Sequence, residues 1–320
     1  YFLAVWIMRR KRYAKIYFWF YIIALVFIIF RTTAVHFHYG LYDSKAAHWV
    51  MSPFYNDHTA YGAALAFCLP FVIGAFFIRI KNDFYKVFIV PLLFVFAGAL
   101  VLSYSRAAWL SFIGACVLFL LIHYRINYKY VLAFFLIVFA AIFTFRHEIE
   151  SRLNKNDQDS SEKLTEHVRS ISNITTDASN MERINRWSSA IRMFKDKPIL
   201  GFGPGTYMFQ YAPYQLSENK TYISTNSADQ GNAHSEYLGP LSESGILGML
   251  LFILLVIVVL KRGIAVYYKV KERSLKIYVM AAILGLFTYV LHGFLNNFLD
   301  TDKLSALFWG AIALIAATDI

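Results

Sequence analysis

Apolar residues occur along this chain in long blocks that are separated by polar segments, which indicates lipid as the solvent for much of it. A bilayer core about 30 Å thick needs about 20 apolar residues in a helix, with a range of about 17–25. About eight blocks approach this length, and Asp, Glu, Lys and Arg occur only at their ends. They are 16–31, 59–78, 87–104, 107–123, 130–145, 242–260, 277–295 and 304–318. The pattern predicts an all-α, polytopic transmembrane helix bundle.

The start of the chain also has the sequence pattern of an apolar helix. Tyr1–Met8 has the composition of the end of an earlier span. We therefore expect that upstream spans are missing from this sequence, in a number that it does not give.

The basic residues of the short connections lie mostly on one side of the predicted bundle. That side holds Arg9, Arg10, Lys11, Arg12, Lys15, Arg79, Lys81, Lys86, Arg125, Lys129, Lys261, Arg262, Lys269, Lys271, Arg273 and Lys276, whereas the other side holds Arg31, Lys45, Arg106 and Lys303. The positive-inside rule places the first side, with both ends of the chain, in the cytoplasm. The formal net charge of +11 is mostly explained by this topology, so nucleic acid is not a predicted partner.

Composition agrees with a membrane protein. Hydrophobic residues make up 58% of the chain and charged residues 16%, and the mean hydropathy is +0.48. Soluble domains are nearer half apolar and a quarter charged. Cys68 and Cys116 both lie in apolar blocks and provide no disulfide framework. A soluble enzyme, a disordered chain and a secreted disulfide scaffold are excluded.

One long polar segment divides the chain into three parts. Residues 1–145 form N-terminal spans, 146–241 a large loop on the outer face, and 242–320 C-terminal spans. Loops of this length are uncommon without a function. We expect the loop to be partly helical.

A helix is predicted within the loop. Ser179 and Glu182 have the spacing of a capping box, and Pro198 ends the helix. Apolar residues recur at three- and four-residue steps, at Ile184, Trp187, Ile191 and Phe194. The GFGPG segment that follows, residues 201–205, fits a tight turn better than a phosphate cradle, because no strand precedes it and no Lys-Ser/Thr follows it.

Each candidate residue has an ordinary interpretation beside a functional one. Arg106 either snorkels to lipid headgroups or binds an anionic substrate as a cation held at the membrane boundary. Arg183 and Arg186 share a helix face, and Glu182 is placed to pair with Arg186. His234 alone is more typical of a surface histidine. His36, His38, His48 and His58 share the outer side, but their spacing fits no standard ligand pattern, so no metal site and no cofactor are predicted.

The candidate arginines and histidine indicate a function more clearly together than each does alone. Arginines and a histidine gather on the outer face beside the membrane. The planar guanidinium suits phosphate oxygens, and an imidazole can take a proton from a hydroxyl near neutral pH. This combination suits the displacement of a lipid-anchored diphosphate by an alcohol.

At these residues the sequence resembles the O-antigen ligase family of membrane glycosyltransferases. The similar segments are NDHTAYGAALAFCLPF (56–71), SYSRAAWLSF (103–112), ERINRWSSAIRMFKDKPILGFGPGTY (182–207) and AHSEYLGPLSESGILG (233–248). The resemblance implies an inverting, metal-independent transfer of a glycan from undecaprenyl diphosphate to an acceptor hydroxyl, in the ligases a sugar of the lipid A core. It also implies a multi-pass protein of the bacterial inner membrane whose active site faces the periplasm.

The resemblance also suggests roles for residues. By position, Arg106 and Arg183 match the family's essential arginines and His234 its essential histidine, with Arg186 as the alternative to Arg183. Arg186, Glu236, His58 and Glu243 are candidates for substrate binding. Ser235 stands where the family usually has Asn, so Ser235 or Glu236 would have to orient the imidazole.

Several alternatives remain open. O-antigen or polysaccharide polymerases and protein O-oligosaccharyltransferases of the same superfamily differ in the acceptor, and a lipid-linked glycan transporter is a different class. A transporter would be expected to have buried charges within its spans or an internal repeat, and the sequence has neither. The glycan, the acceptor and the oligomeric state are not determined by the sequence.

Overall fold

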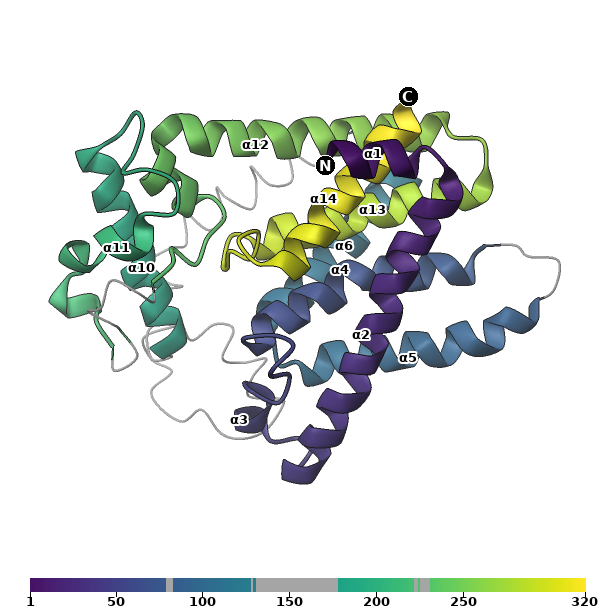
Figure 1. Ribbon diagram of the computed structural model, residues 1–320, viewed down its shortest axis with the longest axis horizontal. Helices are drawn as coiled ribbons and strands as arrows, with labels where there is room; N and C mark the ends of the chain where they lie inside the picture. Colours follow the sequence, from purple (N-terminus) through teal and green to yellow (C-terminus); the bar gives the residue numbers. More distant parts are fainter. Residues whose placement is uncertain (79–82, 128, 131–177, 222–223, 225–230) are drawn as a thin grey trace.

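The computed structural model describes residues 1–78, 83–127, 129–130, 178–221, 224 and 231–320 (Figure 1). Within these ranges the chain consists of α-helices, short 3-10 turns and connecting loops, with no strand. The predicted span 130–145 and the first part of the predicted loop, 146–177, lie outside the described residues. The all-α prediction is confirmed.

The helices fall in two groups along the chain. Those before the undescribed segment are α1 (Phe2–Met8), α2 (Lys11–Tyr39), α3 (Ser44–Ala47), α4 (His58–Phe76), α5 (Lys86–Leu102) and α6 (Arg106–His123); those after it are α10 (Ala178–Asp196), α11 (Tyr207–Gln210), α12 (Leu238–Lys269), α13 (Arg273–His292) and α14 (Asp302–Asp319). Short 3-10 helices occur at Asp83–Tyr85, Ala212–Tyr214 and Ser217–Asn219.

Five of these helices are long and apolar enough to cross a membrane: α2, α4, α6, α12 and α13. Helix α5 is apolar but has 17 residues, and α14 has charged residues at both of its ends. Apart from 130–145, every predicted span overlaps one of these seven helices. The chain is therefore a multi-pass membrane protein, as predicted.

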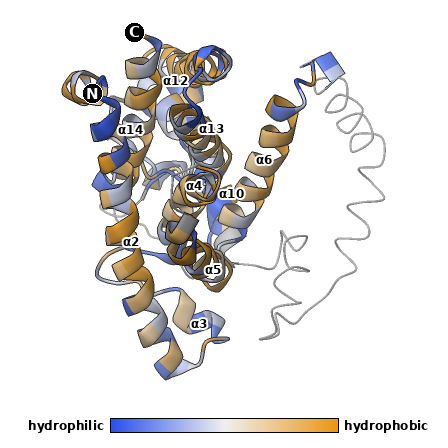
Figure 2. Ribbon diagram, turned by 90° about the vertical axis from the view of Figure 1, so that its right-hand side faces the viewer, coloured by the Kyte–Doolittle hydropathy of each residue, from blue (hydrophilic) through white to orange (hydrophobic). Residues whose placement is uncertain are grey.

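Helices α4 and α13 form the centre of the bundle. They pack against each other, and α5, α6 and α14 surround them. Residues on almost every side of α4 are buried, from Ala60 to Ala75. The outer helices instead expose large apolar side chains, such as Phe94 on α5 and Leu251 on α12. Hydrophobic colour also follows the outer helices in Figure 2, as expected for surfaces that face lipid.

The two ends of the bundle differ in charge and in the size of the segments that connect the helices. At the basic end, Lys11 lies 2.6 Å from Glu272, and Arg262 pairs with Asp319. The opposite end, which we call the α10 end, contains the loops 40–57, 103–105 and 293–301 and the described residues 178–221 and 231–237 (toward the left of Figure 1). Segments far apart in the sequence thus meet at the α10 end.

The GFGPG segment forms a turn on α12, as predicted. Its three glycines have positive φ, and the amide of Gly203 donates to the carbonyl of Glu243 at 2.7 Å. Helix α12 is kinked there, because Gly245 has φ 66° and ψ −164°. A Cβ atom on Gly245 would lie 2.2 Å from the carbonyl oxygen of Ile199. Glycine is therefore required for the close contact that fixes the end of α10 to the start of α12.

The crossing of α4 and α13 also depends on a glycine. A Cβ atom on Gly285 would lie 2.8 Å from the carbonyl oxygen of Phe67 and 2.9 Å from its ring, whereas one on Gly98 of α5 would meet no atom within 4 Å. Small residues allow membrane helices to approach closely.

We expect Gly285→Leu to lower the thermal unfolding midpoint in detergent, since overpacking typically costs about 1–3 kcal/mol.

The matched control is Gly98→Leu, which adds the same side chain in open space. It should unfold at the wild-type temperature. Equal midpoints for the two variants would contradict the importance of the α4–α13 contact.

Candidate functional site

His234 lies in the segment 231–237, between α10 and the start of α12. Its φ is +46°, which is uncommon for a residue other than glycine. Its amide donates to Oδ1 of Asn232 at 3.0 Å, and its carbonyl accepts from Nε1 of Trp187 on α10 at 3.3 Å. These contacts hold the backbone of the histidine from both sides.

The surroundings of His234 favour a neutral imidazole. Burial lowers its pKa to about 4; the guanidinium groups of Arg183 and Arg186 act in the same direction, and Glu182 and Asp57 oppose them. Both burial and nearby cations disfavour the charged imidazolium. At neutral pH this side chain is therefore a free base beside two arginines.

Arg183 connects α10 to the loop after α13. Its Nε donates to the carbonyl of Leu295 at 3.3 Å, and its side chain is half-buried. Its charge also acts on His58, the first residue of α4, and on His292, the last residue of α13. Arg183 thus joins α10 to the loop after α13 and lies within electrostatic range of the start of α4.

Arg106 approaches the same place from α6, of which it is the first residue. Its charge acts on His58 together with that of Arg183. The approach of α6 to α4 is close, because a Cβ atom on Gly62 would lie 2.8 Å from Cβ of Ser105. The structure therefore places Arg106 and Arg183, from separate parts of the sequence, within electrostatic range of His58, and Arg183 also within range of His234.

Arg186 has different surroundings from Arg183. Its Nε lies 2.5 Å from Oε1 of Glu182, and both side chains are buried, which confirms the predicted intrahelical pair. Its guanidinium also stacks on the ring of Tyr211, 4.1 Å from the centroid. Gly231 packs so closely that a Cβ atom there would lie 2.0 Å from Nη1 of Arg186. Arg186 thus belongs to the core of the loop region.

Helix α10 differs from the sequence prediction in two respects. It already includes Ala178, so Ser179 lies inside the helix and the predicted capping box is wrong. Its buried face is also mostly polar, with Glu182, Asn185, Arg186, Ser189, Ala190 and Met193, whereas Ile191 of the apolar pattern is 42% exposed. The polar residues form a hydrogen-bonded network in which Nδ2 of Asn185 lies 2.8 Å from Oε1 of Gln215.

The comparison with known families agrees with this geometry. The sequence matches the O-antigen ligase family over residues 91–253, which is half of the chain. The chain belongs to the O-antigen ligase family. Members of this family are membrane enzymes of the glycosyltransferase type, and the matched region contains Arg106, Arg183 and His234. No curated protein matches the chain.

Ser235 and Glu236, the two residues predicted to orient the imidazole of His234, make other contacts in this O-antigen ligase family member. The hydroxyl oxygen of Ser235 accepts from the amides of Tyr237 and Leu238, both at 3.3 Å, at the start of α12. Among the described residues, no hydrogen bond joins Ser235 or Glu236 to the imidazole of His234. Asn232 and Trp187 hold the backbone instead, and sequence reasoning did not find them.

Glu236 connects the histidine segment to the loop between α13 and α14. Its Oε1 accepts from the hydroxyl of Tyr289 and from the amides of Phe298 at 2.7 Å and Leu299 at 2.9 Å. Its own amide donates to the carbonyl of Gly293. Burial raises the pKa of Glu236, and the three hydrogen bonds oppose that shift. The carboxylate thus fixes the loop 293–301 against the segment that carries His234.

Glu243 also binds backbone, since its Oε1 accepts from the amide of Tyr207 at 2.9 Å. The substrate-binding role expected for Glu236 and Glu243 stays a prediction, beside these structural contacts. Asp57, another residue that the sequence analysis missed, caps α4 by accepting from the amides of Thr59 and Ala60. Its place directly before an apolar helix is the sequence signal that identifies such a cap.

The histidines on this side of the family member do not share one environment. Nε2 of His36 lies 2.9 Å from the carbonyl oxygen of Asp43, whereas the rings of His48 and His58 lie 4.1 Å apart. Within the described ranges, no group of three or more His, Cys, Asp or Glu side chains is arranged to hold a metal ion.

The Glu236 contacts can be tested by substitution. Glu236→Ala removes the acceptor of the buried Tyr289 hydroxyl and of the partly buried Leu299 amide, and one of the two acceptors of the Phe298 amide. A buried donor without a partner costs about 1–3 kcal/mol. We expect a lower thermal midpoint and faster proteolysis between α13 and α14. Glu236→Gln keeps an acceptor oxygen and should lie between the alanine variant and wild type.

The control is Glu218→Ala, which removes an exposed carboxylate on the same side of the bundle. It should be cleaved at the wild-type rate. If the protease cleaves residues 293–301 of Glu236→Ala no faster than those of the control, the carboxylate does not hold the loop.

Proposed function

We propose that this chain transfers a glycan from a lipid diphosphate, undecaprenyl diphosphate, to an acceptor hydroxyl. The observation that carries the proposal is the neutral imidazole of His234 within range of the charge of Arg183, while Arg106, the first residue of α6, acts together with Arg183 on the neighbouring His58. A base beside cations suits a reaction in which an alcohol loses a proton and a phosphate gains negative charge.

In this proposal Arg106 and Arg183 bind the diphosphate. They come from different helices, and the charges of both act on His58, which supports a diphosphate site shared by the two guanidinium groups. Arginine binds phosphate oxygens through paired N–H donors. We assign Arg186 to the architecture of the loop region instead, because its buried pair with Glu182 and its stack on Tyr211 already fix its side chain.

The reaction step balances without an external reactant. The acceptor oxygen attacks the anomeric carbon from the face opposite the diphosphate, and a carbon–oxygen bond forms while the bond to the leaving phosphate oxygen breaks. The electron pair of that bond stays on the diphosphate, where the arginines stabilise the additional charge. The acceptor proton passes to His234, and the product has an inverted anomeric configuration.

Substrate binding would strengthen the base. In the free protein, burial and the arginines hold the pKa of His234 near 4, which makes the imidazole neutral but weakly basic. A bound diphosphate offsets the arginine charges, and a nearby anion raises the pKa of a histidine. The base would therefore become competent only when the donor is in place.

The charge distribution supports a periplasmic active site. The basic end of the bundle corresponds to the cytoplasm by the positive-inside rule, so the α10 end would face the periplasm of a bacterial inner membrane.

The proposed acceptor is a sugar of the lipid A core. Glycoconjugates of a deletion strain would separate acceptors: loss of glycan on lipid A supports the ligase, loss of long chains alone a polymerase, and loss on protein an oligosaccharyltransferase.

Substitution of the cluster tests the assigned roles. We expect Arg106→Met, Arg183→Met and His234→Ala to lower glycan transfer by about 100- to 1000-fold, as for the removal of one transition-state donor in other enzymes, and to remain folded in the membrane. Transfer by purified protein in liposomes, with a lipid-linked donor, is the measurement.

Two variants serve as comparisons. Lys195→Met removes an exposed cation from the same helix and should transfer at the wild-type rate. Arg186→Met should instead destabilise the protein by about 3–5 kcal/mol, because it leaves Glu182 buried without its partner. Near-normal transfer by Arg183→Met or His234→Ala would refute the roles proposed here.

The pH dependence gives a separate test. His234 must be neutral to act as a base, and its pKa in the free protein is about 4, so kcat/KM for the donor should stay flat from pH 8 down to about pH 5 and fall below it. The acidic limb of kcat should lie at higher pH, because bound diphosphate raises the pKa. A limb of kcat/KM centred near 6.5, the ordinary value for histidine, would contradict the buried base.

A further inference from the structure

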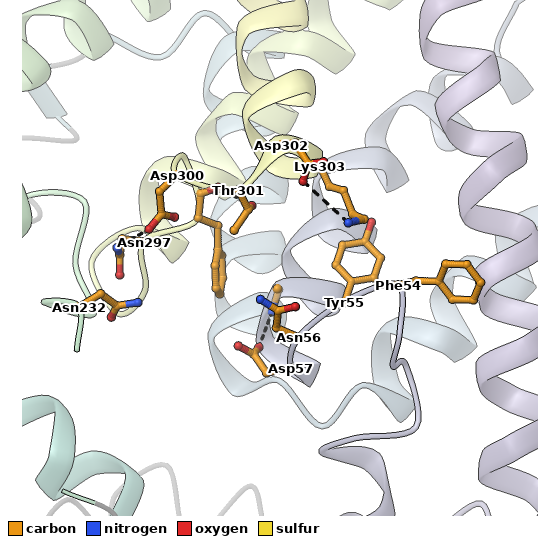
Figure 3. A pocket seen from close by; sticks show the side chains of 12 residues that line it. Phe54, Tyr55, Asn56, Asp57, Asn232, Asn297, Asp300, Thr301, Asp302 and Lys303 are labelled. Atoms are coloured by element: carbon orange, nitrogen blue, oxygen red, sulfur yellow. Dashed lines mark hydrogen bonds and ion pairs between the residues drawn. The ribbon is translucent and has the colours of Figure 1, made fainter. Parts of the chain in front are cut away.

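A polar cavity of about 450 Å³ lies at the α10 end, next to the histidine segment. Small-molecule sites commonly have volumes of about 300–1,000 Å³. Three parts of the chain form its wall: the residues before α4, the loop between α13 and α14 with the first residues of α14, and Asn232 (Figure 3). The arginines of the proposed diphosphate site do not line it.

The wall of this cavity combines amides, carboxylates and aromatic rings. Figure 3 shows the amides of Asn232 and Asn297 at one end, and Tyr55 and Lys303 at the other. Amides both donate and accept hydrogen bonds, whereas carboxylates only accept. Hydroxyl groups, which also donate and accept, are the ligand groups that this combination satisfies.

Asn297 supplies a second indication of a ligand. Its Oδ1 is buried and has no hydrogen-bond partner among the described residues, while its Nδ2 lies 3.5 Å from Oδ2 of Asp300. Buried polar atoms normally have partners, and an exception requires an explanation. Rotation of the Asn297 side chain, which lines the cavity, would expose this oxygen to a ligand hydroxyl that donates to it.

The charge of the cavity is opposite to that of the neighbouring cluster. Asp57, Asp300 and Asp302 line it, and Lys303 is the one cation among the lining residues. Nζ of Lys303 lies 3.8 Å from Oδ1 of Asp302 and 5.9 Å from the centre of the Tyr55 ring. The remaining carboxylates repel an anionic ligand, so a phosphorylated or uronic sugar is disfavoured.

The cavity is connected to His234 through two of its lining residues. Oδ1 of Asn232 accepts from the amide of His234 at 3.0 Å, and the charge of Asp57 acts on the imidazole. We propose that this cavity binds an uncharged sugar unit through its hydroxyl groups, next to the histidine. The inference rests on the proposed glycan transfer for its purpose, and the sugar belongs either to the donor or to the acceptor.

The binding test does not require turnover. Saturation-transfer NMR would use purified protein in detergent with free methyl glucoside, methyl N-acetylglucosaminide and methyl glucuronide. We expect signals from the two neutral glycosides and at least a several-fold weaker signal from the glucuronide. Asp300→Asn should reduce this difference, and Asn297→Ala should weaken all three signals.

These variants are chosen to preserve the fold. Asp300 is exposed at the rim, whereas Asp57 caps α4 and is left intact. Glu218→Gln, on the same side of the bundle but outside the cavity, is the control and should behave as wild type. Equal signals from neutral and anionic glycosides, or pocket variants that bind like the control, would overturn the proposal.

Transfer kinetics then identify the source of the sugar. If the donor sugar occupies the cavity, Asp300→Asn and Asn297→Ala should raise KM for the donor about tenfold or more; if the acceptor sugar does, KM for the acceptor should rise instead. Unchanged KM values for both substrates would refute the cavity as a substrate site. Glycoside binding without any transfer would instead count against the proposed function and leave the sugar site standing.

Discussion

The arrangement at the α10 end depends on keeping guanidinium groups at the edge of a membrane bundle. A cation that is partly removed from water is stable only if polar groups or counter-charges compensate it. Arg186 is compensated by Glu182 and by the ring of Tyr211, and Arg183 by the carbonyl of Leu295 among its contacts. The same positive charge, together with burial, keeps His234 unprotonated. One electrostatic environment therefore accounts for the neutral base and for the anion site that we propose.

Backbone contacts then set the position of this environment. Gly62 allows α6 to approach α4, so the charge of Arg106 acts on His58. Gly245 allows the end of α10 to contact α12. Glu236 ties the histidine segment to the loop 293–301, which also supplies the carbonyl that holds Arg183. Few of these contacts are between side chains of the cluster itself. The geometry of the site is thus a consequence of how the helices end and cross.

The parts that sequence could predict are those governed by local patterns. Apolar blocks predict the helices because lipid requires the backbone to satisfy its own hydrogen bonds, and the glycines of GFGPG predict a turn because they tolerate positive φ. The Glu182–Arg186 pair follows from helical spacing. The partners of His234 could not be found in this way, since Trp187 and Asn232 act through its backbone. The buried polar face of α10 was also unpredictable, because Tyr211 and Gln215, which follow the helix in the chain, supply its partners.

The charge pattern at this end suggests how one enzyme could hold two chemically different parts of a substrate. A cationic cluster on α6 and α10 lies beside a cavity whose charged groups are mostly carboxylates. Under the two proposals made above, the first would attract a diphosphate and the second would repel it, so the charges favour one orientation for a neutral sugar on a diphosphate. The imidazole of His234 is within electrostatic range of both, since Arg183 lowers its pKa and Asp57 opposes that shift. The bond to be broken, between sugar and diphosphate, would then lie where the two potentials meet, within reach of the base.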